Sequence, residues 1–276
     1  MWIQGWMHPA RSRRWGVRTN RGTQGHDRAA QGRRRVAALL FAAAAVLYNG
    51  WLLEFVLPTG LDPRHSYVSE LYAADQPLRW LFGGIESVCA VLVGGGALLA
   101  GGAASGIRVR CGIRSRTIRA RTDWWARAGW WALLGLALSS LADVYLPMRC
   151  APSVEPGCEA VHPWHTATSA LAHFFVFASM ALLGRAAATD APRMPLIRRW
   201  GTWVLALALP TAVCTVGPLF GRPGWHGIPQ RAHLTLVGVW FALLAAELAG
   251  ASRQEDREPE AGRERVPEAA QPADSG

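Results

Sequence analysis

Six long apolar segments alternate with polar, Arg-rich connectors along the chain. Each segment is roughly 20 residues long, which is the length that an α-helix needs to cross the hydrocarbon core of a bilayer. Their approximate bounds are Val36–Leu57, Trp80–Ala104, Ala126–Leu146, Thr166–Arg185, Trp200–Phe220 and Arg231–Gly250. The pattern predicts an all-α polytopic membrane protein, a bundle of six transmembrane helices.

The basic residues follow the same alternation. All 29 are arginines: nine lie between residues 11 and 35, seven between 108 and 127, four between 185 and 199, and four in the C-terminal tail. The other three connectors hold one or two each. The positive-inside rule predicts a multi-pass protein of the cell (plasma) membrane. Both of its termini would lie in the cytoplasm, and three of its loops would lie outside. This alternation accounts for the net charge of +10, so the charge does not indicate nucleic-acid binding.

Two tails flank the predicted transmembrane domain of residues 36–250. Residues 1–35 are rich in Arg, and residues 251–276 are rich in Glu, Arg, Pro and Ala. We expect both to be disordered, and the C-terminal tail has nothing to bury. The first apolar segment begins only at Val36 and is too long for the apolar region of a signal peptide, which predicts a retained anchor.

Two of the five cysteines lie in the second outer loop. Cys150 and Cys158 are eight residues apart. If the predicted topology holds, they face an oxidising compartment, which favours a disulfide over two free thiols or a metal pair.

Small residues recur on one face of the second segment, at Gly83, Ser87, Ala90, Gly94, Ala97 and Gly101. Such a stripe lets another helix approach closely, and that helix belongs either to this chain or to a second copy in a homo-oligomer. Glu86 lies beside the stripe and so faces protein, where a carboxylate needs a partner.

Ionisable and hydroxyl side chains gather at the outer ends of the segments. Asp143 lies near the outer end of the third segment, and His165 and His173 lie two helical turns apart on one face of the fourth. The candidates for lining a polar cavity are Ser66, Ser69, Glu70, Glu86, Asp143, His165, His173, Arg231 and His233. The inner halves of the segments are nearly free of ionisable groups, except for Glu247. This one-sidedness indicates a cavity open to the outer face and not a channel.

Some of these residues have structural interpretations that compete with a site. Glu54 is one turn from the outer end of its segment, where its carboxylate can reach the lipid headgroups. Residues 66–72 have apolar positions at helical spacing, which predicts a short surface helix. Ser66 would then be its N-cap, with Ser69 or Glu70 supplying the reciprocal bond.

Several motifs resemble those of the bacterial membrane proteins grouped as domain of unknown function 998. The motifs are Ser66-x-x-Ser69-Glu70-Leu71 with Gln76-Pro77, Asp143-x-x-x-Pro147-x-x-Cys150-Ala151-Pro152 with Cys158, His173, and Gly227-x-x-x-Arg231. The resemblance extends from about Val36 to Gly250 and implies a multi-pass architecture. It implies no activity.

A weaker likeness is to membrane zinc hydrolases of the ceramidase and progestin-receptor type. Asp143, His173 and His233 are the zinc-ligand candidates, but the last segment lacks the paired histidines of those enzymes. Two functions therefore compete. One is a cofactor-free protein that binds a lipid or small molecule in the outer cavity, with membrane lipids as partners. The other is a zinc-dependent hydrolase of a lipid amide or ester. A haem carrier is disfavoured because the inner halves hold no histidine.

Overall fold

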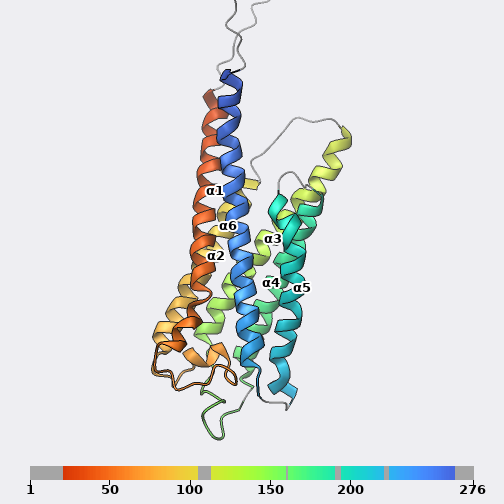
Figure 1. The fold of residues 1–276 in the computed structure, drawn as a ribbon. Helices are drawn as coiled ribbons and strands as arrows, with labels where there is room; N and C mark the ends of the chain where they lie inside the picture. The colour runs from red at the N-terminus through yellow and green to blue at the C-terminus, as the bar shows by residue number, and fades with distance from the viewer. Residues whose placement is uncertain (1–20, 105–112, 160, 190–193, 221–223, 265–276) are drawn as a thin grey trace, which may run out of the picture.

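The computed structural model describes residues 21–104, 113–159, 161–189, 194–220 and 224–264 (Figure 1). These residues form six α-helices and three short 3-10 helices, with no strand among them. The α-helices are α1 (Arg21–Leu47), α2 (Arg79–Ala104), α3 (Ile113–Tyr145), α4 (Pro163–Thr189), α5 (Pro195–Val213) and α6 (Gly227–Glu264). The 3-10 helices are η1 (Gly50–Phe55), η2 (Val68–Tyr72) and η3 (Cys214–Phe220). The predicted all-α class is confirmed.

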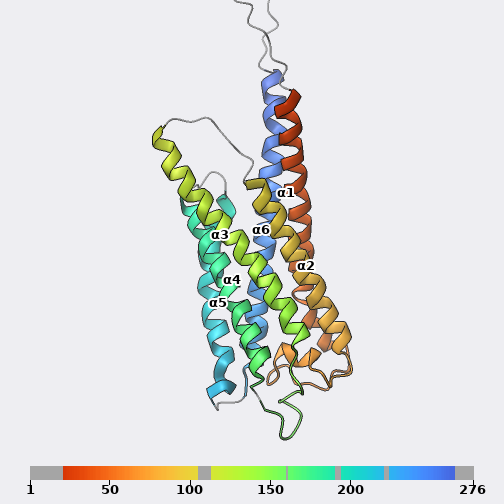
Figure 2. The same ribbon diagram turned by 180° about the vertical axis from the view of Figure 1, so that it is seen from behind.

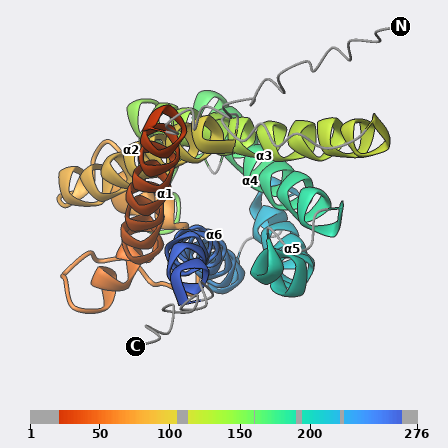
Figure 3. The same cartoon turned by 90° about the horizontal axis from the view of Figure 1, so that it is seen from above.

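The helices form a closed ring in chain order. Each α-helix packs against the next, and α6 returns to pack against α1 (Figure 3). We call the end with η1, η2, η3 and residues 146–159 the loop end, and the end where α1 begins and α6 ends the tail end. Seen from behind, α3 runs between α2 and α4 and leans away from the ring towards the tail end (Figure 2).

Five of the six helices are long and apolar enough to cross a membrane. These stretches are Arg28–Phe55, Arg79–Gly102, Pro163–Thr189, Pro195–Pro218 and Gly227–Ser252. The predicted third span, in α3, is not among them, because its apolar part carries tryptophans, serines and Asp143. Because α3 packs between α2 and α4, which are both long and apolar enough to cross a membrane, we retain the six-span count as a prediction. The cytoplasmic location of both termini also stays a prediction.

Helix continues past the apolar segments at both ends of the chain. It begins at Arg21 and ends at Glu264, within the two tails of residues 1–35 and 251–276, whose disorder stays a prediction. The helix extends this far because Arg, Gln, Glu and Ala form helix readily without being buried. Gln31 and Ser252 join the two extensions through a hydrogen bond of 3.1 Å from the amide Nε2 to the carbonyl oxygen. Residues 1–20 and 265–276 lie outside the described residues.

The small-residue stripe of α2 faces α3 of the same chain. An added Cβ would lie 3.3 Å from the Cβ of Ala137 at Gly94, and 3.5 Å from the Cβ of Trp130 at Gly101. The stripe therefore serves a contact within one chain, as one of the two alternatives predicted. Self-association stays a prediction without an assigned surface.

Candidate functional site

Asp143, near the loop end of α3, is the centre of a hydrogen-bonded network. Its Oδ1 accepts hydrogen bonds from the hydroxyls of Thr168 at 2.6 Å and Ser169 at 2.7 Å, both on α4. Its Oδ2 accepts one from the hydroxyl of Tyr72 in η2 at 2.8 Å. Burial and the nearby Asp143 raise the pKa of Tyr72 well above its ordinary value of 10, so this hydroxyl stays a donor. Hydroxyl groups thus hold a buried carboxylate in place.

His165 lies against the same carboxylate. Its Nδ1 is 3.3 Å from Asp143 Oδ1, but the two atoms are not aligned for a hydrogen bond, and Nδ1 has no other hydrogen-bond partner. The side chain is buried. The contact is therefore close but not a hydrogen bond, and it places the His165 imidazole against the central carboxylate of the network.

Glu86 extends this network to α2 and α1. It lies beside the Ser140 hydroxyl and near Asp143, and the side chain of Tyr48, the residue that follows α1, is close to it. The Tyr48 ring packs edge-on against Phe241 of α6, with 5.2 Å between ring centroids, so Tyr48 faces the interior of the ring. Glu86 and Tyr48 are only partly buried although they face inward. Both residues therefore keep part of their surface accessible.

Two stacked histidines continue the network towards α6. The rings of His173 and His233 lie 4.9 Å apart between centroids at an angle of 16°. His173 Nδ1 is 2.7 Å from the Ser169 carbonyl oxygen, and His233 Nδ1 is 3.1 Å from that of Ala208. Because a carbonyl oxygen only accepts, each Nδ1 carries a proton, and the lone pair of each imidazole in its neutral form is on Nε2. Ser169 links the histidines to Asp143, since its hydroxyl bonds Asp143 and its carbonyl bonds His173.

Arg231 lies in a separate cluster at the start of α6. Its Nε and Nη2 donate to the two carboxylate oxygens of Glu54, each at 2.6 Å. Its Nη1 donates to the carbonyl oxygens of Ser66 at 2.9 Å and Gly227 at 3.1 Å. Glu54 and Arg231 are both buried, so the suggestion that Glu54 reaches the lipid headgroups is wrong. The pair fastens η1 and the first loop to α6.

Gly227 explains the spacing of the Gly227-x-x-x-Arg231 motif. The backbone of the first loop passes so close that a Cβ on Gly227 would lie 2.6 Å from the Ser66 carbonyl oxygen. Real Cβ atoms do not approach an oxygen so closely, so only glycine fits. One turn later, Arg231 then reaches the same carbonyl group.

Ser66, Ser69 and Glu70 belong to the fold of the loops and lie apart from Asp143. Glu70 Oε1 accepts from the Tyr67 N–H at 2.8 Å, and its Oε2 accepts from the Ser153 N–H at 3.0 Å and hydroxyl at 2.5 Å. The predicted N-cap is wrong, since η2 is capped at Tyr67 while the Ser66 hydroxyl bonds the Asp62 carbonyl. The Ser69 hydroxyl lies 3.4 Å from the Met148 sulfur.

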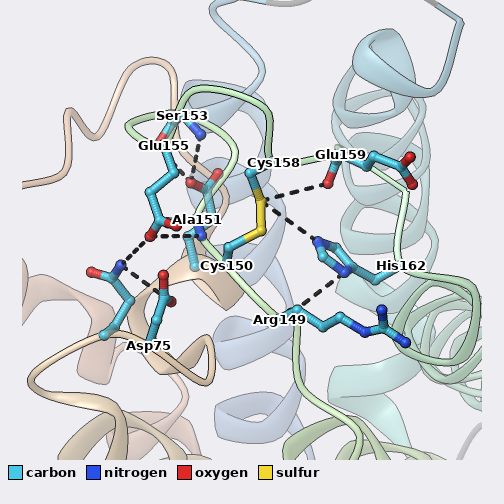
Figure 4. Close-up of a disulfide and its surroundings, with 11 residues drawn as sticks. Asp75, Arg149, Cys150, Ala151, Ser153, Glu155, Cys158, Glu159 and His162 are labelled. Atoms are coloured by element: carbon cyan, nitrogen blue, oxygen red, sulfur yellow. Dashed lines mark hydrogen bonds between the residues drawn. A yellow bond between two sulfur atoms is a disulfide. The ribbon is translucent and has the colours of Figure 1, made fainter.

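Cys150 and Cys158 lie at disulfide distance in the loop between α3 and α4, as predicted (Figure 4). His162 Nε2 is 4.0 Å from Cys158 Sγ, and the Arg149 N–H donates to His162 Nδ1 at 3.4 Å. Within the described part of the chain, these two cysteines and His162 form the one set of three potential metal ligands whose donor atoms all lie within 4.8 Å of one another. A disulfide removes the thiolates that would bind a metal.

The predicted site residues thus divide into groups. Glu86, Asp143, His165, His173 and His233 come together, whereas the Arg231 and Glu70 clusters are separate.

Sequence reasoning missed Tyr48, Tyr72 and Thr168 as members of the Asp143 network. Thr168 carried a signal, because it lies three residues after His165 and so on the same helix face. Tyr72 carried none, because only the folded loop brings it to Asp143.

Residues 36–247, more than half of the chain, match the family described as Protein of unknown function (DUF998). No curated protein matches the chain, and no solved structure does. The match covers all the residues of the Asp143 network and of the Glu54–Arg231 cluster. The chain therefore belongs to the DUF998 family.

Proposed function

We propose that this chain is a non-catalytic membrane protein that binds a lipid or small molecule among the polar groups around Asp143. One observation carries the proposal. Side chains that belong to or adjoin this network, namely Tyr48, Glu86, Ser169 and His173, keep part of their surface accessible, while Asp143 itself is buried. Groups that serve only to hold helices together have no need of an accessible face.

The chemistry of the network limits the ligand. Glu86 and Asp143 supply carboxylate oxygens, and His173 and His233 supply Nε2 lone pairs, so the site is rich in acceptors. Arg231 is held by Glu54 and is not directed at this network. The ligand therefore carries N–H or O–H donors, as do amine and polyhydroxyl headgroups, and it enters from the loop end.

Native mass spectrometry tests the proposal. The full-length protein, extracted in a mild detergent, is expected to retain an adduct of constant mass. Asp143→Asn should release it, because the amide no longer accepts all the surrounding hydroxyls. Asp62→Asn is the matched control, since Asp62 lies in an exposed loop pair with Arg64. If neither protein carries an adduct, or if Asp143→Asn keeps it while remaining folded, the proposal fails.

A zinc-dependent hydrolase is the second candidate, and one feature favours it. His173 and His233 each donate Nδ1–H to a backbone carbonyl, as zinc-bound histidines do, which leaves both Nε2 atoms available. The stacking opposes it, because a metal lies in the plane of each imidazole ligand and these planes are nearly parallel. Metal analysis separates the candidates: about one zinc per chain, lost in both Asp143→Ala and His173→Ala, would favour the hydrolase.

A further inference from the structure

Two hollows flank α3 near the tail end, away from the Asp143 network. The smaller, about 220 Å³, lies between α2 and α3, and the larger, about 650 Å³, lies between α3 and α4. Arg127 and Trp131 line both. Both side chains are exposed, so the two hollows adjoin one another across this part of α3.

Each hollow runs from Arg127 towards the middle of the bundle. Leu134 lines the smaller one two helical turns further along α3, which is roughly 10 Å deeper at 1.5 Å per residue. Phe174 and Phe175 of α4 line the larger one at its deep end. Apart from Arg127, the lining is apolar and aromatic. Trp131, which is 66% exposed, stands between them.

We propose that this surface binds one anionic diacyl phospholipid, with its phosphate on Arg127 and one acyl chain in each hollow. The charge argues for the phosphate. Arg127 ends a run of seven arginines between residues 108 and 127 that includes a single acidic residue, Asp123. The guanidinium group has five N–H donors, so a phosphate adds to the interaction that Arg127 already makes within the chain.

The shape argues for two chains. A single-chain lipid fills one hollow and leaves the other, whereas a glycerophospholipid spreads its two chains from one phosphate and straddles Trp131. Tryptophan beside arginine at this depth is the arrangement found at the membrane interface, where phosphates and glycerol groups lie. The site is independent of the ligand proposed for the Asp143 network.

Titration of the full-length protein in mild detergent, followed by native mass spectrometry, tests the inference. The probes are dioleoyl-phosphatidylglycerol, dioleoyl-phosphatidylcholine and single-chain oleoyl-phosphatidylglycerol. We expect one molecule of dioleoyl-phosphatidylglycerol to bind tightest. Arg127→Gln should weaken it about tenfold, the usual effect of losing one charged hydrogen-bonding partner. Arg198→Gln is the control, because Arg198 is also exposed near the tail end but lines neither hollow.

A steric variant tests the two-chain geometry separately. Gly102 lines the smaller hollow, and a Cβ added there meets nothing within 4 Å, so Gly102→Leu fills the hollow without disturbing the packing. It should abolish the preference for two chains over one and leave single-chain binding unchanged. Equal affinity of wild type and Arg127→Gln, equal affinity for the three probes, or an unchanged two-chain preference in Gly102→Leu would each overturn the inference.

Discussion

The buried pair of Glu54 and Arg231 gives a prediction that the structure makes quantitative. In Glu54→Leu, Arg231 loses its two hydrogen bonds of 2.6 Å but stays buried, with Nη1 still held by the carbonyls of Ser66 and Gly227. Removing one partner of a buried ion pair costs about 3–5 kcal/mol, because the other charge is left uncompensated. We expect the free energy of unfolding to fall by that amount.

The double variant separates the pair from its surroundings. Glu54→Leu with Arg231→Met removes both charges, and apolar replacement of a buried pair is often neutral. The Ser66 carbonyl oxygen then loses its donor, which costs about 1–3 kcal/mol. The double variant should therefore lose about 1–3 kcal/mol, well below the sum of the two single variants.

Equilibrium unfolding in dodecylmaltoside micelles with increasing SDS measures these values through tryptophan fluorescence. The matched control is Asp62→Asn, which breaks an ion pair whose Asp62 and Arg64 side chains are 41% and 59% exposed. This variant should unfold as the wild type does, since exposed pairs contribute little. A loss under about 1 kcal/mol in Glu54→Leu, or strictly additive losses in the double variant, would refute the reasoning.

Two further predictions use the same unfolding assay. Gly227→Ala should lower the free energy of unfolding by about 1–3 kcal/mol, because the added methyl group overpacks the contact with the first loop. Gly84→Ala is the control and should have no such effect, because a Cβ at Gly84 meets nothing within 4 Å. Similar effects of the two variants would contradict the close approach at Gly227. Burial, then the nearby His65 and Arg231, lower the pKa of His226 to about 4 from an ordinary 6.5. Between these values only the unfolded chain takes up the proton, so stability is complete above pH 6.5 and falls as the pH drops towards 4. Wild type should lose about 1–3 kcal/mol more than His226→Phe between pH 7 and pH 4, and equal losses would exclude His226 as the cause.

The sequence predicted the helices and the depth of the site along them, because the length and the polarity of a segment are local properties. A run of roughly 20 apolar residues identifies a span wherever its neighbours lie. The rise of the helix likewise placed Glu86, Asp143 and His173 at similar depths before any contact was known. The small-residue stripe of α2 was visible for the same reason, since it needs only the helical period.

Partner identity was not predictable, because it depends on how each helix is rotated and where each loop folds. Glu54 and Arg231 are 177 residues apart, and nothing near either residue indicates the other. His165 and His173 share one face of α4, yet His165 contacts Asp143 while His173 stacks on His233. The stripe drifts around the helix over two turns, and that drift is enough to give the two histidines different neighbours.

The joining of η1 to α6 has a consequence for how the chain is made. Glu54 leaves the ribosome 177 residues before Arg231. At 5–20 residues per second, the carboxylate waits roughly 9–35 seconds for its counter-ion. During that interval the first helix must keep Glu54 in water or against the insertion machinery, because a lone charge is costly in lipid. The Glu54–Arg231 ion pair, which joins η1 to α6, can therefore form only after Arg231 of α6 has been synthesised.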